Sequence, residues 1–285
     1  MTPPPHSVKF KSIMLMAVNI GNSSTRIGFF LFDGQEPFVH RFPTHPLRSA
    51  REYFEELKAE FERYGFTAEQ KKMPDAGALC SVVPSHNDVF LELLAMMLKT
   101  KEQGRKVNKP LIINHKTALG MKFDVENPAA LGADRIAASY GAWKMYGGPV
   151  CVIDAGTATT VNFVTADGLF LGGAIMPGLG LMRDSLQSGT AGLPYVDIEA
   201  DTTGKPPKAA IGTNTTGAIL SGIIFGTAGA ISRVIEEAEL MRLEKFKVAL
   251  TGGYAGLVAP CLKRLDFHEP ALALKGIRLI SIAVF

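Results

Sequence analysis

The sequence predicts an α/β protein built from two duplicated domains, each with a mixed sheet flanked by helices. Strand-like and helical segments alternate along the chain, which is typical of α/β layers. A strand–turn–strand pattern occurs twice, beginning near residue 13 and again near residue 150, which indicates an internal duplication. At 285 residues and 47% apolar residues, the chain is long enough for two modest domains with cores of their own.

The first half combines short strands with three amphipathic or buried helices. Its strands are expected at residues 13–20, 25–32, 36–42, 76–83 and 111–114. Its helices are expected at residues 49–64, 88–98 and 136–145. We expect a loose tail at 1–12, a first domain at 13–135 and a second domain at 136–285, with the boundary somewhere within 125–150.

The second half begins with the same strand–turn–strand pattern and continues with a third strand that ends at Gly172-Gly173. Later elements are expected at residues 179–187 (helix), 215–240 (helix), 246–250 (strand) and after 253 (helix). The apolar part of the long helix is shorter than the ~20 residues that a membrane span needs. Its glycines, Gly222, Gly226 and Gly229, favour close packing against another helix.

Charge and cysteine content argue against a nucleic-acid partner and against a cysteine-ligated metal site. The formal net charge is only +3, and no Lys/Arg cluster is longer than a pair, so nucleic acid is not an expected partner. The three cysteines, Cys80, Cys151 and Cys261, are isolated and have no metal-ligand spacing. They are expected to be buried thiols in a reducing cytoplasm.

The two strand–turn–strand segments share a pattern of small polar residues. AVNIGNSSTR (17–26) and CVIDAGTATTVNFV (151–164) each stop an apolar run at a glycine, and each leads to an Asp-Gly turn, Asp33-Gly34 or Asp167-Gly168. Setting Asn19 on Asp154 places Gly21 on Gly156, and it places Ser24 and Thr25 on Thr159 and Thr160.

Such a turn directs successive backbone N–H groups to one point, which suits phosphate, and a nearby Asp can hold a cation. The alternative is a pair of unrelated hairpins whose glycines serve only as turn residues. The phosphate ligands expected from the first turn are Asn19, Gly21, Asn22, Ser23, Ser24, Thr25 and Arg26, and those from the second are Gly156 and Thr159. The pair resembles the phosphate-binding hairpins of the actin, hexokinase and heat-shock ATPase superfamily. That resemblance implies two ribonuclease-H-like domains with ATP between them.

Further segments resemble the type III pantothenate kinases across nearly the whole chain from about Met14. The matching segments are NPAALGADRIAASYGAW (127–143), DAGTATT (154–160), LGGAIMPGLGLMRDSLQSGTAGLP (171–194), IGTNTTGAILSGIIFG (211–226), VALTGGYA (248–255) and EPALALKGIRLI (269–280). The resemblance implies a transferase that moves the γ-phosphoryl group of ATP to pantothenate, giving 4'-phosphopantothenate in the first step of coenzyme A synthesis. It also implies Mg²⁺, a monovalent cation (K⁺ or NH₄⁺), a homodimer, and no membrane or nucleic-acid partner.

The resemblance also assigns roles to particular residues. Asp134 is the expected catalytic base, although an N-cap or an ion-paired aspartate would have the same position in the sequence. The pantothenate site is expected to comprise Gly132, Ala133, Asp134, Arg135 and Thr190. Asp154 is the expected monovalent-cation ligand, Thr157 an expected ATP contact, and Gly252 and Gly253 are expected near the adenosine.

Two positions depart from the family's pattern, because Asn19 and Asn162 stand where aspartate is usual. Asparagine keeps a carbonyl oxygen but loses the negative charge of aspartate. The affinity for a metal ion should therefore fall unless another group compensates for that charge. Two hypotheses therefore remain: an active kinase with altered metal handling, or a non-catalytic nucleotide-binding or regulatory paralog. A different kinase or a polyphosphate-cleaving phosphatase is a weaker alternative, because it does not explain the GADR segment or the C-terminal match.

Overall fold

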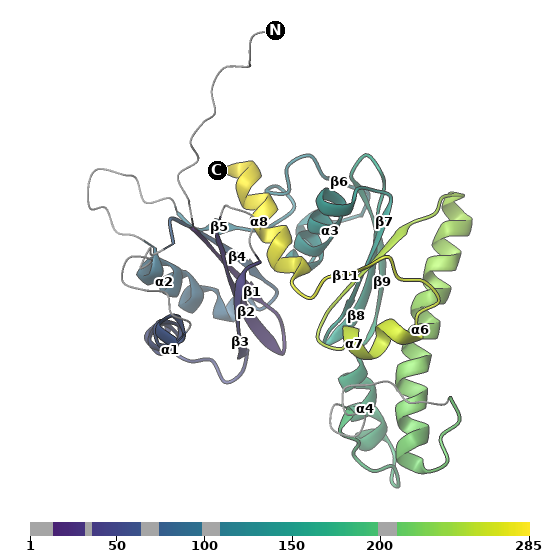
Figure 1. The fold of residues 1–285 in the computed structure, drawn as a ribbon. Helices are drawn as coiled ribbons and strands as arrows, with labels where there is room; N and C mark the ends of the chain where they lie inside the picture. Colours follow the sequence, from purple (N-terminus) through teal and green to yellow (C-terminus); the bar gives the residue numbers. More distant parts are fainter. Residues whose placement is uncertain (1–13, 32–35, 64–73, 99–108, 199–209) are drawn as a thin grey trace, which may run out of the picture. The chain divides into compact units, whose positions relative to one another are not determined.

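The computed structural model describes residues 14–31, 36–63, 74–98, 109–198 and 210–285. The chain divides into two compact units, Met1–Ile113 and Asn114–Phe285, and each unit is built around one sheet (Figure 1). The expected tail at 1–12 and the Asp33-Gly34 turn lie outside the described residues.

The first unit has a mixed five-stranded sheet in the order β3-β2-β1-β4-β5. Its strands are β1 (Met14–Ile20), β2 (Ser24–Leu31), β3 (Phe38–Pro43), β4 (Ala76–Ser81) and β5 (Leu111–Ile112). The first three form an antiparallel meander, while β4 and β5 run parallel to β1. The strands predicted from the apolar runs are confirmed, and β5 is shorter than expected.

Two helices, α1 (Ala50–Arg63) and α2 (Asn87–Met97), cover the sheet of the first unit. A capping box starts α1, because Glu52 accepts the backbone N–H of Ser49 and the Ser49 hydroxyl accepts the N–H of Glu52. From α1 the fully buried Tyr53 packs edge-on against Phe42 and also against Phe90 of α2, with ring centroids 5.0 and 4.9 Å away. This aromatic cluster anchors both helices to the sheet.

The second unit has a mixed six-stranded sheet in the order β11-β10-β7-β8-β9-β6. Its strands are β6 (Lys122–Phe123), β7 (Val150–Ala155), β8 (Ala158–Val164), β9 (Leu169–Pro177), β10 (Lys247–Thr251) and β11 (Phe267–His268). Its main helices are α3 (Ala133–Tyr146), α4 (Leu179–Gly189), α6 (Thr215–Arg242), α7 (Ala255–Val258) and α8 (Leu272–Val284).

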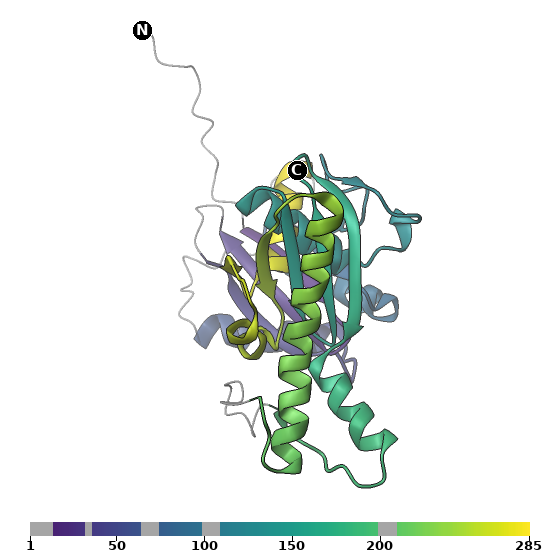
Figure 2. The same cartoon turned by 90° about the vertical axis from the view of Figure 1, so that its right-hand side faces the viewer.

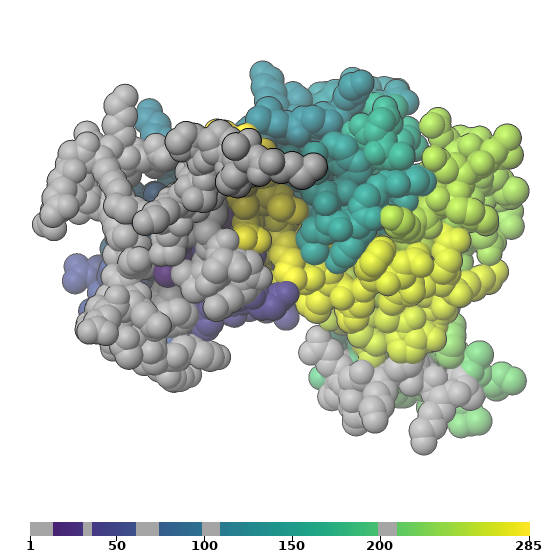
Figure 3. Space-filling model, turned by 45° about the horizontal axis from the view of Figure 1, so that its top comes forward, coloured from purple at the N-terminus to yellow at the C-terminus, as the bar shows by residue number. Residues whose placement is uncertain are grey.

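Helices cover both faces of this second sheet. Figures 1 and 2 show α3 and α8 on one face and the long α6 on the other. The α3–α8 contact is close because a Cβ on Gly141 would lie 3.0 Å from the Gly276 Cα, and one on Gly276 would overlap the Ala137 carbonyl. In the space-filling view, yellow C-terminal residues of this unit lie directly against teal residues of the same unit (Figure 3).

The two units repeat one topology, which confirms the predicted duplication. The order β3-β2-β1-β4-β5 in the first unit corresponds to β9-β8-β7-β10-β11 in the second, with β6 added at the edge. The pairing register agrees as well: Ser24 lies opposite Pro43, and Ala158 lies opposite Pro177. The predicted fold class, two duplicated α/β units with mixed sheets, is therefore correct.

The division between the units falls at Ile113/Asn114, earlier in the chain than the boundary expected near 135. The residues after it belong to the second unit because β6 pairs with β9. In addition, Tyr140 of α3 donates its hydroxyl to the Leu119 carbonyl at 3.2 Å. The two-residue strands β6 and β11 were not predicted, because strands this short carry no periodicity. The C-terminal helix α8 was not predicted either.

Among the described residues, α6 is long and apolar enough to span a membrane by length and composition alone. Within the chain, 56% of that apolar window is buried. Its inner side packs on β7, β8 and β10 in the main core of the second unit, through residues such as Ile224, Ala228 and Ile231. The length and apolar character of α6 are therefore explained by its place as the central core helix of this unit.

Glu239 ties the end of α6 to the start of β10, and its substitution tests this junction. The side chain is 7% exposed and accepts hydrogen bonds from Arg264 and Lys245, both at 2.5 Å, and from the Phe246 N–H at 3.2 Å. Burial alone would raise the pKa of Glu239, but these hydrogen bonds outweigh it and lower the pKa. We expect Glu239→Gln to lower the free energy of unfolding by about 2 kcal/mol at pH 7.

Because the folded-state pKa is lowered, this stabilisation is present above the unfolded pKa of about 4.3 and is lost as pH falls through the folded value. Urea unfolding at pH 7 and at pH 4 should therefore show a smaller difference from wild type at the lower pH. The control is Glu237→Gln, which removes an exposed pair with Arg233 and should change stability by less than about 0.5 kcal/mol. Equal losses for the two variants would contradict the assignment.

Candidate functional site

The turn between β1 and β2, which we call turn 1 (Gly21–Ser23), is held by threonine hydroxyls. The Gly21 N–H donates to the Ser24 carbonyl at 3.1 Å, and the Thr44 N–H donates to the Ser23 carbonyl at 3.1 Å. The Thr44 hydroxyl donates to the Gly21 carbonyl at 2.7 Å and lies 3.2 Å from the Thr25 hydroxyl. Both threonines are buried, so the path of turn 1 is set from inside the unit.

The turn between β7 and β8, which we call turn 2 (Gly156–Thr157), has the same backbone scheme. The Gly156 N–H donates to the Ala158 carbonyl at 3.2 Å, and the Gly178 N–H donates to the Thr157 carbonyl at 3.0 Å. A Cβ on Gly178 would overlap the carbonyl oxygens of Gly156 and Thr157, so only glycine allows this approach. Turn 2 is therefore formed by backbone packed on backbone.

Strand pairing corrects the frame in which the two turns were aligned. Thr25 lies opposite Ile20, and Thr159 lies opposite Ala155, so Thr25 corresponds to Thr159 and not to Thr160. The alignment of Ser24 with Thr159 was wrong for the same reason. Turn 1 has one more residue than turn 2, and this insertion shifts every position after the turn.

The corrected frame shows how the turns differ. Thr44 and Gly178 occupy equivalent positions, because each donates its N–H to the turn. Thr25 therefore has the Thr44 hydroxyl as a partner, whereas Thr159, equally buried, has a hydroxyl with no hydrogen-bond partner among the described residues. Sequence reasoning missed Thr44 and Gly178; the signal for both is the small residue after Pro43 and Pro177.

The oxygen ligands near the turns suit a hard cation that is also held by phosphates and water. Asn19, at the end of β1, has a buried Oδ1 without a hydrogen-bond partner in the described part of the chain. Asp154, at the end of β7, has its Oδ1 3.3 Å from where a Cβ of Gly156 would lie, so the carboxylate folds over turn 2. No group of three or more His, Cys, Asp or Glu side chains is placed to hold a metal within the described ranges. Each of these residues, within its own unit, can therefore supply one oxygen to a metal–phosphate complex but cannot enclose a metal by itself.

The predicted adenosine residues Gly252 and Gly253 lie beside turn 2. Gly252 has a φ of +107°, and a Cβ there would come within 2.5 Å of the Ala155 backbone. Tyr254, the residue after Gly253, donates its N–H to the Ala155 carbonyl at 2.9 Å. The structure thus brings together Asp154, Gly156, Thr157, Gly252 and Gly253. In the first unit, the side chains of Asn22 and Ser23 are exposed at turn 1.

Asp134 lies in the first turn of α3, which begins at Ala133, three residues before the expected start. Gly132 is the N-cap, and Asp134 Oδ1 accepts the Arg135 backbone N–H at 2.7 Å. Burial raises the pKa of Asp134, and the backbone hydrogen bond and the charge of Arg135 only partly oppose this. A carboxylate with a raised pKa is a stronger base than an exposed aspartate.

Arg135 is held over the sheet by side chains that face α3. Its Nε donates to Asn162 Oδ1 at 2.7 Å, and the Asn162 Nδ2 donates to the Thr160 hydroxyl at 3.1 Å. Its guanidinium carbon lies 5.8 Å from the centroid of the Phe170 ring. Asn162, singled out as a missing carboxylate, is thus a buried hydrogen-bond partner of Arg135.

Thr190 is exposed at the C-terminal end of α4, where its hydroxyl donates to the Leu186 carbonyl at 2.8 Å. The helix begins beside turn 2, because Gly178 is its N-cap. Eleven helical residues span about 16 Å, so Thr190 lies about one helix length from turn 2. The structure does not group Thr190 with turn 2.

Solved structures define the fold class. The ethanolamine utilization protein EutJ from Carboxydothermus hydrogenoformans matches with a TM-score of 0.53 at 15% identity, over 98% of this chain and 91% of that chain. Component A of the (R)-2-hydroxyglutaryl-CoA dehydratase of Acidaminococcus fermentans matches with a TM-score of 0.52 at 13% identity, over 96% and 100%. These similarities show the fold alone, an α/β fold that this chain shares with both proteins.

Sequence comparison defines the family within that class. The model of the type III pantothenate kinase family matches residues 15–237. The type III pantothenate kinase of Rubrobacter xylanophilus is 37% identical over 273 residues, covering 94% of this chain and 97% of that relative. The one from Moorella thermoacetica is 34% identical over 268 residues, covering 94% and 98%. The chain therefore belongs to the type III pantothenate kinase family.

The contact at Gly178 predicts that turn 2 cannot accommodate a side chain there. Gly178→Ala should lower the free energy of unfolding by about 2 kcal/mol, because the added methyl displaces two carbonyls. It should also raise the KM for ATP by about tenfold, if turn 2 binds phosphate. Thermal unfolding and initial-rate kinetics measure the two effects. Gly256→Ala is the matched control, because a Cβ at Gly256 meets no atom within 4 Å.

Proposed function

We propose that this protein phosphorylates pantothenate at the expense of ATP, as a cytoplasmic enzyme that supplies the first intermediate of coenzyme A synthesis. The observation that carries the proposal is the half-buried Asp134 carboxylate with a raised pKa at the start of α3, beside Arg135, in a chain of this family. Thr190 and the Gly132–Arg135 segment are proposed to line the pantothenate site.

Asp134 acts on the proton of the attacking alcohol. In phosphoryl transfer, positioning and charge stabilisation dominate, and the hydroxyl proton leaves late. Asp134 orients the hydroxyl by accepting its hydrogen bond, and it takes the proton as the alcohol oxygen bonds to the γ-phosphorus and the bond from that phosphorus to the ADP oxygen breaks. Its raised pKa makes this acceptance more favourable than for an exposed aspartate.

Both turns are proposed to bind the phosphates of ATP, and kinases of this family use ATP with a divalent metal. Mg²⁺ offsets phosphate charge when bound. Asn19 is proposed to hold it, directly or through water, with its otherwise unpartnered Oδ1. Asp154 is proposed to hold K⁺ or NH₄⁺ near turn 2. The proposed ATP contacts are Asn19, Gly21, Asn22, Ser23, Ser24, Thr25, Arg26, Gly156, Thr157, Thr159, Gly252 and Gly253.

The non-catalytic alternative rests on the two asparagines and is the weaker hypothesis. Asn162 has a hydrogen-bond partner at each end of its amide, Arg135 and Thr160, so an asparagine is accommodated at this position. Asn19 retains a buried oxygen that has no hydrogen-bond partner among the described residues. Asp134 and Asp154 are both present. The non-catalytic alternative therefore depends only on whether Asn19 weakens the binding of the metal ion.

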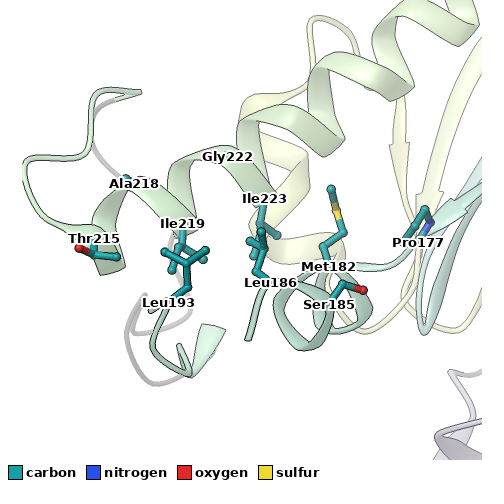
Figure 4. A pocket seen from close by; sticks show the side chains of 10 residues that line it. All are labelled: Pro177, Met182, Ser185, Leu186, Leu193, Thr215, Ala218, Ile219, Gly222 and Ile223. Atoms are coloured by element: carbon teal, nitrogen blue, oxygen red, sulfur yellow. The ribbon is translucent and has the colours of Figure 1, made fainter. Parts of the chain in front are cut away.

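We also propose a homodimer formed through α4 and α6. A groove of about 530 Å³ lies between these helices (Figure 4). Its lining is almost entirely apolar: Pro177, Met182, Ser185, Leu186, Leu193, Thr215, Ala218, Ile219, Gly222 and Ile223. The glycines of α6 that were expected to pack against another helix, Gly222, Gly226 and Gly229, are exposed, and a Cβ on any of them meets no atom of the chain within 4 Å.

An exposed row of glycines permits the backbone of a second copy to approach α6 closely. The groove extends this surface with apolar side chains from α4, which suits an obligate homodimer. Thr190 lies at its edge, because its hydroxyl accepts the N–H of the groove residue Leu193 at 3.3 Å. A second copy would therefore cover a proposed substrate residue.

The function is tested by coupled ADP release from purified protein with pantothenate, Mg²⁺, and K⁺ exchanged for Na⁺. The proposal expects ADP release that requires pantothenate and increases with K⁺. Nucleotide binding without turnover, unchanged in Asn19→Asp, would instead establish the non-catalytic alternative. ADP release that does not depend on pantothenate but increases when a sugar is added would indicate another kinase of the same fold.

Asp134→Asn should lower kcat by roughly a thousandfold and leave ATP binding nearly intact, because the amide cannot accept a proton. Steady-state kinetics and nucleotide titration measure the two effects. The wild-type rate should decline on the acid side at a pH above the range of an ordinary aspartate, near 3.9, because burial raises the pKa of Asp134. Turnover retained in Asp134→Asn would falsify the base assignment.

Gly222→Arg should convert the proposed dimer to a monomer. Arginine is a better helix former than glycine, and the position is open within the chain, so the fold should persist. The bulky charge would block apolar contact across α6. Size-exclusion chromatography with light scattering should give twice the chain mass for wild type and for the control Glu237→Gln, and the chain mass for Gly222→Arg. A dimeric Gly222→Arg would refute this interface.

A further inference from the structure

Two segments of the first unit hold turn 1 and the strand end before it. The Thr44 N–H and hydroxyl donate to the Ser23 and Gly21 carbonyls, at 3.1 and 2.7 Å. From the segment after β4, the Val82 N–H donates at 3.0 Å to the carbonyl of Ile20, the residue directly before turn 1. The path of turn 1 therefore depends on the positions of both Thr44 and Val82.

The side chains of His45 and His86, which we call the histidine pair, connect these two segments. His45 directly follows Thr44. The His86 N–H donates at 3.0 Å to the carbonyl of Val83, the residue after Val82. The two imidazole rings meet edge to face, with their centroids 4.9 Å apart. The histidine pair therefore completes a ring of contacts that runs through Thr44, turn 1 and Val82.

His86 lies where an additional proton is unfavourable. The residue is 4% exposed, and its Nδ1 is buried without a hydrogen-bond partner in the described part of the chain. A neutral imidazole can leave Nδ1 unprotonated, whereas the charged ring must carry a proton there. Burial lowers the pKa of His86, and the charge of the exposed His45 lowers it further. A charged pair therefore combines a buried N–H that lacks an acceptor with two like charges in contact.

No other described charge offsets a proton on His86. Both α1 and β4 pack against α2, which begins directly after His86. The ionisable side chains on these elements and in the segment before α1 that are not exposed are Arg48, Tyr53, Glu56, Glu60 and Cys80. Arg48 and Glu56 are paired with each other at 2.7 Å. Of the described ionisable groups, only His45 acts on the pKa of His86 through its charge.

We propose that the histidine pair is a proton-sensitive switch that controls turn 1. At neutral pH the two uncharged rings pack together and keep the Thr44 and Val82 segments in place at the turn. In acid both rings become charged, their contact opens, and the backbone of turn 1 loses part of its support. The effect on ATP rests on the proposed function, because weaker nucleotide binding follows only if turn 1 binds phosphate.

The first test needs no ligand, because hydrogen exchange followed by mass spectrometry reports the opening of the turn 1 amides in the full chain. We expect these amides to exchange about fivefold faster in wild type than in His86→Phe at pH 5.5, and equally within about twofold at pH 7.5. Phenylalanine keeps an aromatic contact with His45 but cannot take a proton. Comparison at a single pH cancels the intrinsic pH dependence of exchange. The control His268→Gln, which changes an exposed histidine of the second unit, should match wild type.

His45→Asn is a second variant, should His86→Phe not fold. It removes the opposing charge and leaves His86 in place, so exchange of the turn 1 amides at pH 5.5 should be at least about twofold slower than in wild type. Exchange at pH 5.5 that is equal in wild type and in each folded variant would overturn the inference.

Thermal stability should depend on the same proton. The pKa of His86 in the folded protein lies below its unfolded value of about 6.5. Below pH 6.5 the unfolded chain therefore binds more protons than the folded one, so stability is lost as pH falls through 6.5 toward the folded value. The decrease in Tm from pH 7.5 to pH 5.5 should be larger for wild type than for His86→Phe. An equal decrease would contradict the assignment of the proton to His86.

Titration with ATP and Mg²⁺, without pantothenate, shows whether the switch acts on the proposed nucleotide site. Between pH 7.5 and pH 5.5, the Kd for ATP should rise about fivefold more in wild type than in His86→Phe. Exchange at turn 1 that depends on the histidine pair, with no ATP binding at either pH, would leave the switch intact and overturn the proposed function. ATP binding with the same pH dependence in both proteins would overturn the control of nucleotide binding by the pair.

Discussion

The arrangement of the second unit depends on the contact between the backbone of Gly178 and turn 2. The Gly178 N–H bonds to the Thr157 carbonyl while its Cα occupies space that no side chain could share. This contact fixes where β9 ends and α4 begins, and with them the wall of the groove at α6. The first unit has the same backbone hydrogen bond, from Thr44 to Ser23, so the two units share this constraint.

The two turns differ in the groups that satisfy their buried polar atoms. In turn 1 the Thr44 hydroxyl satisfies the Gly21 carbonyl and approaches Thr25, so the turn is closed by side chains. In turn 2 the equivalent residue is Gly178, and the Thr159 hydroxyl has no partner among the described residues. A buried polar group without a partner costs free energy, so its retention is consistent with a ligand that supplies the partner.

At the start of α3, burial disfavours the charged forms of two neighbouring residues, Asp134 and Arg135. Burial raises the pKa of Asp134 and lowers that of Arg135, so both groups are less stable in their charged forms than at a surface. A site that binds an anionic substrate can use both, since one group accepts a proton and the other balances a charge. Asn162, which donates to Thr160 and accepts from Arg135, holds this pair in place without altering the net charge.

The sequence by itself determined the duplication, the main strands, the long helices and the grouping of Asp134 with Arg135, because apolar periodicity and local motifs are short-range properties. It also determined the family, through segments spread along the chain. Only the tertiary structure decided that Thr25 corresponds to Thr159, that residues after 113 belong to the second unit, and that Asn162 bonds to Arg135. Each of these depends on cross-strand register or on contact between distant segments, and such contacts leave no periodic signal in the chain.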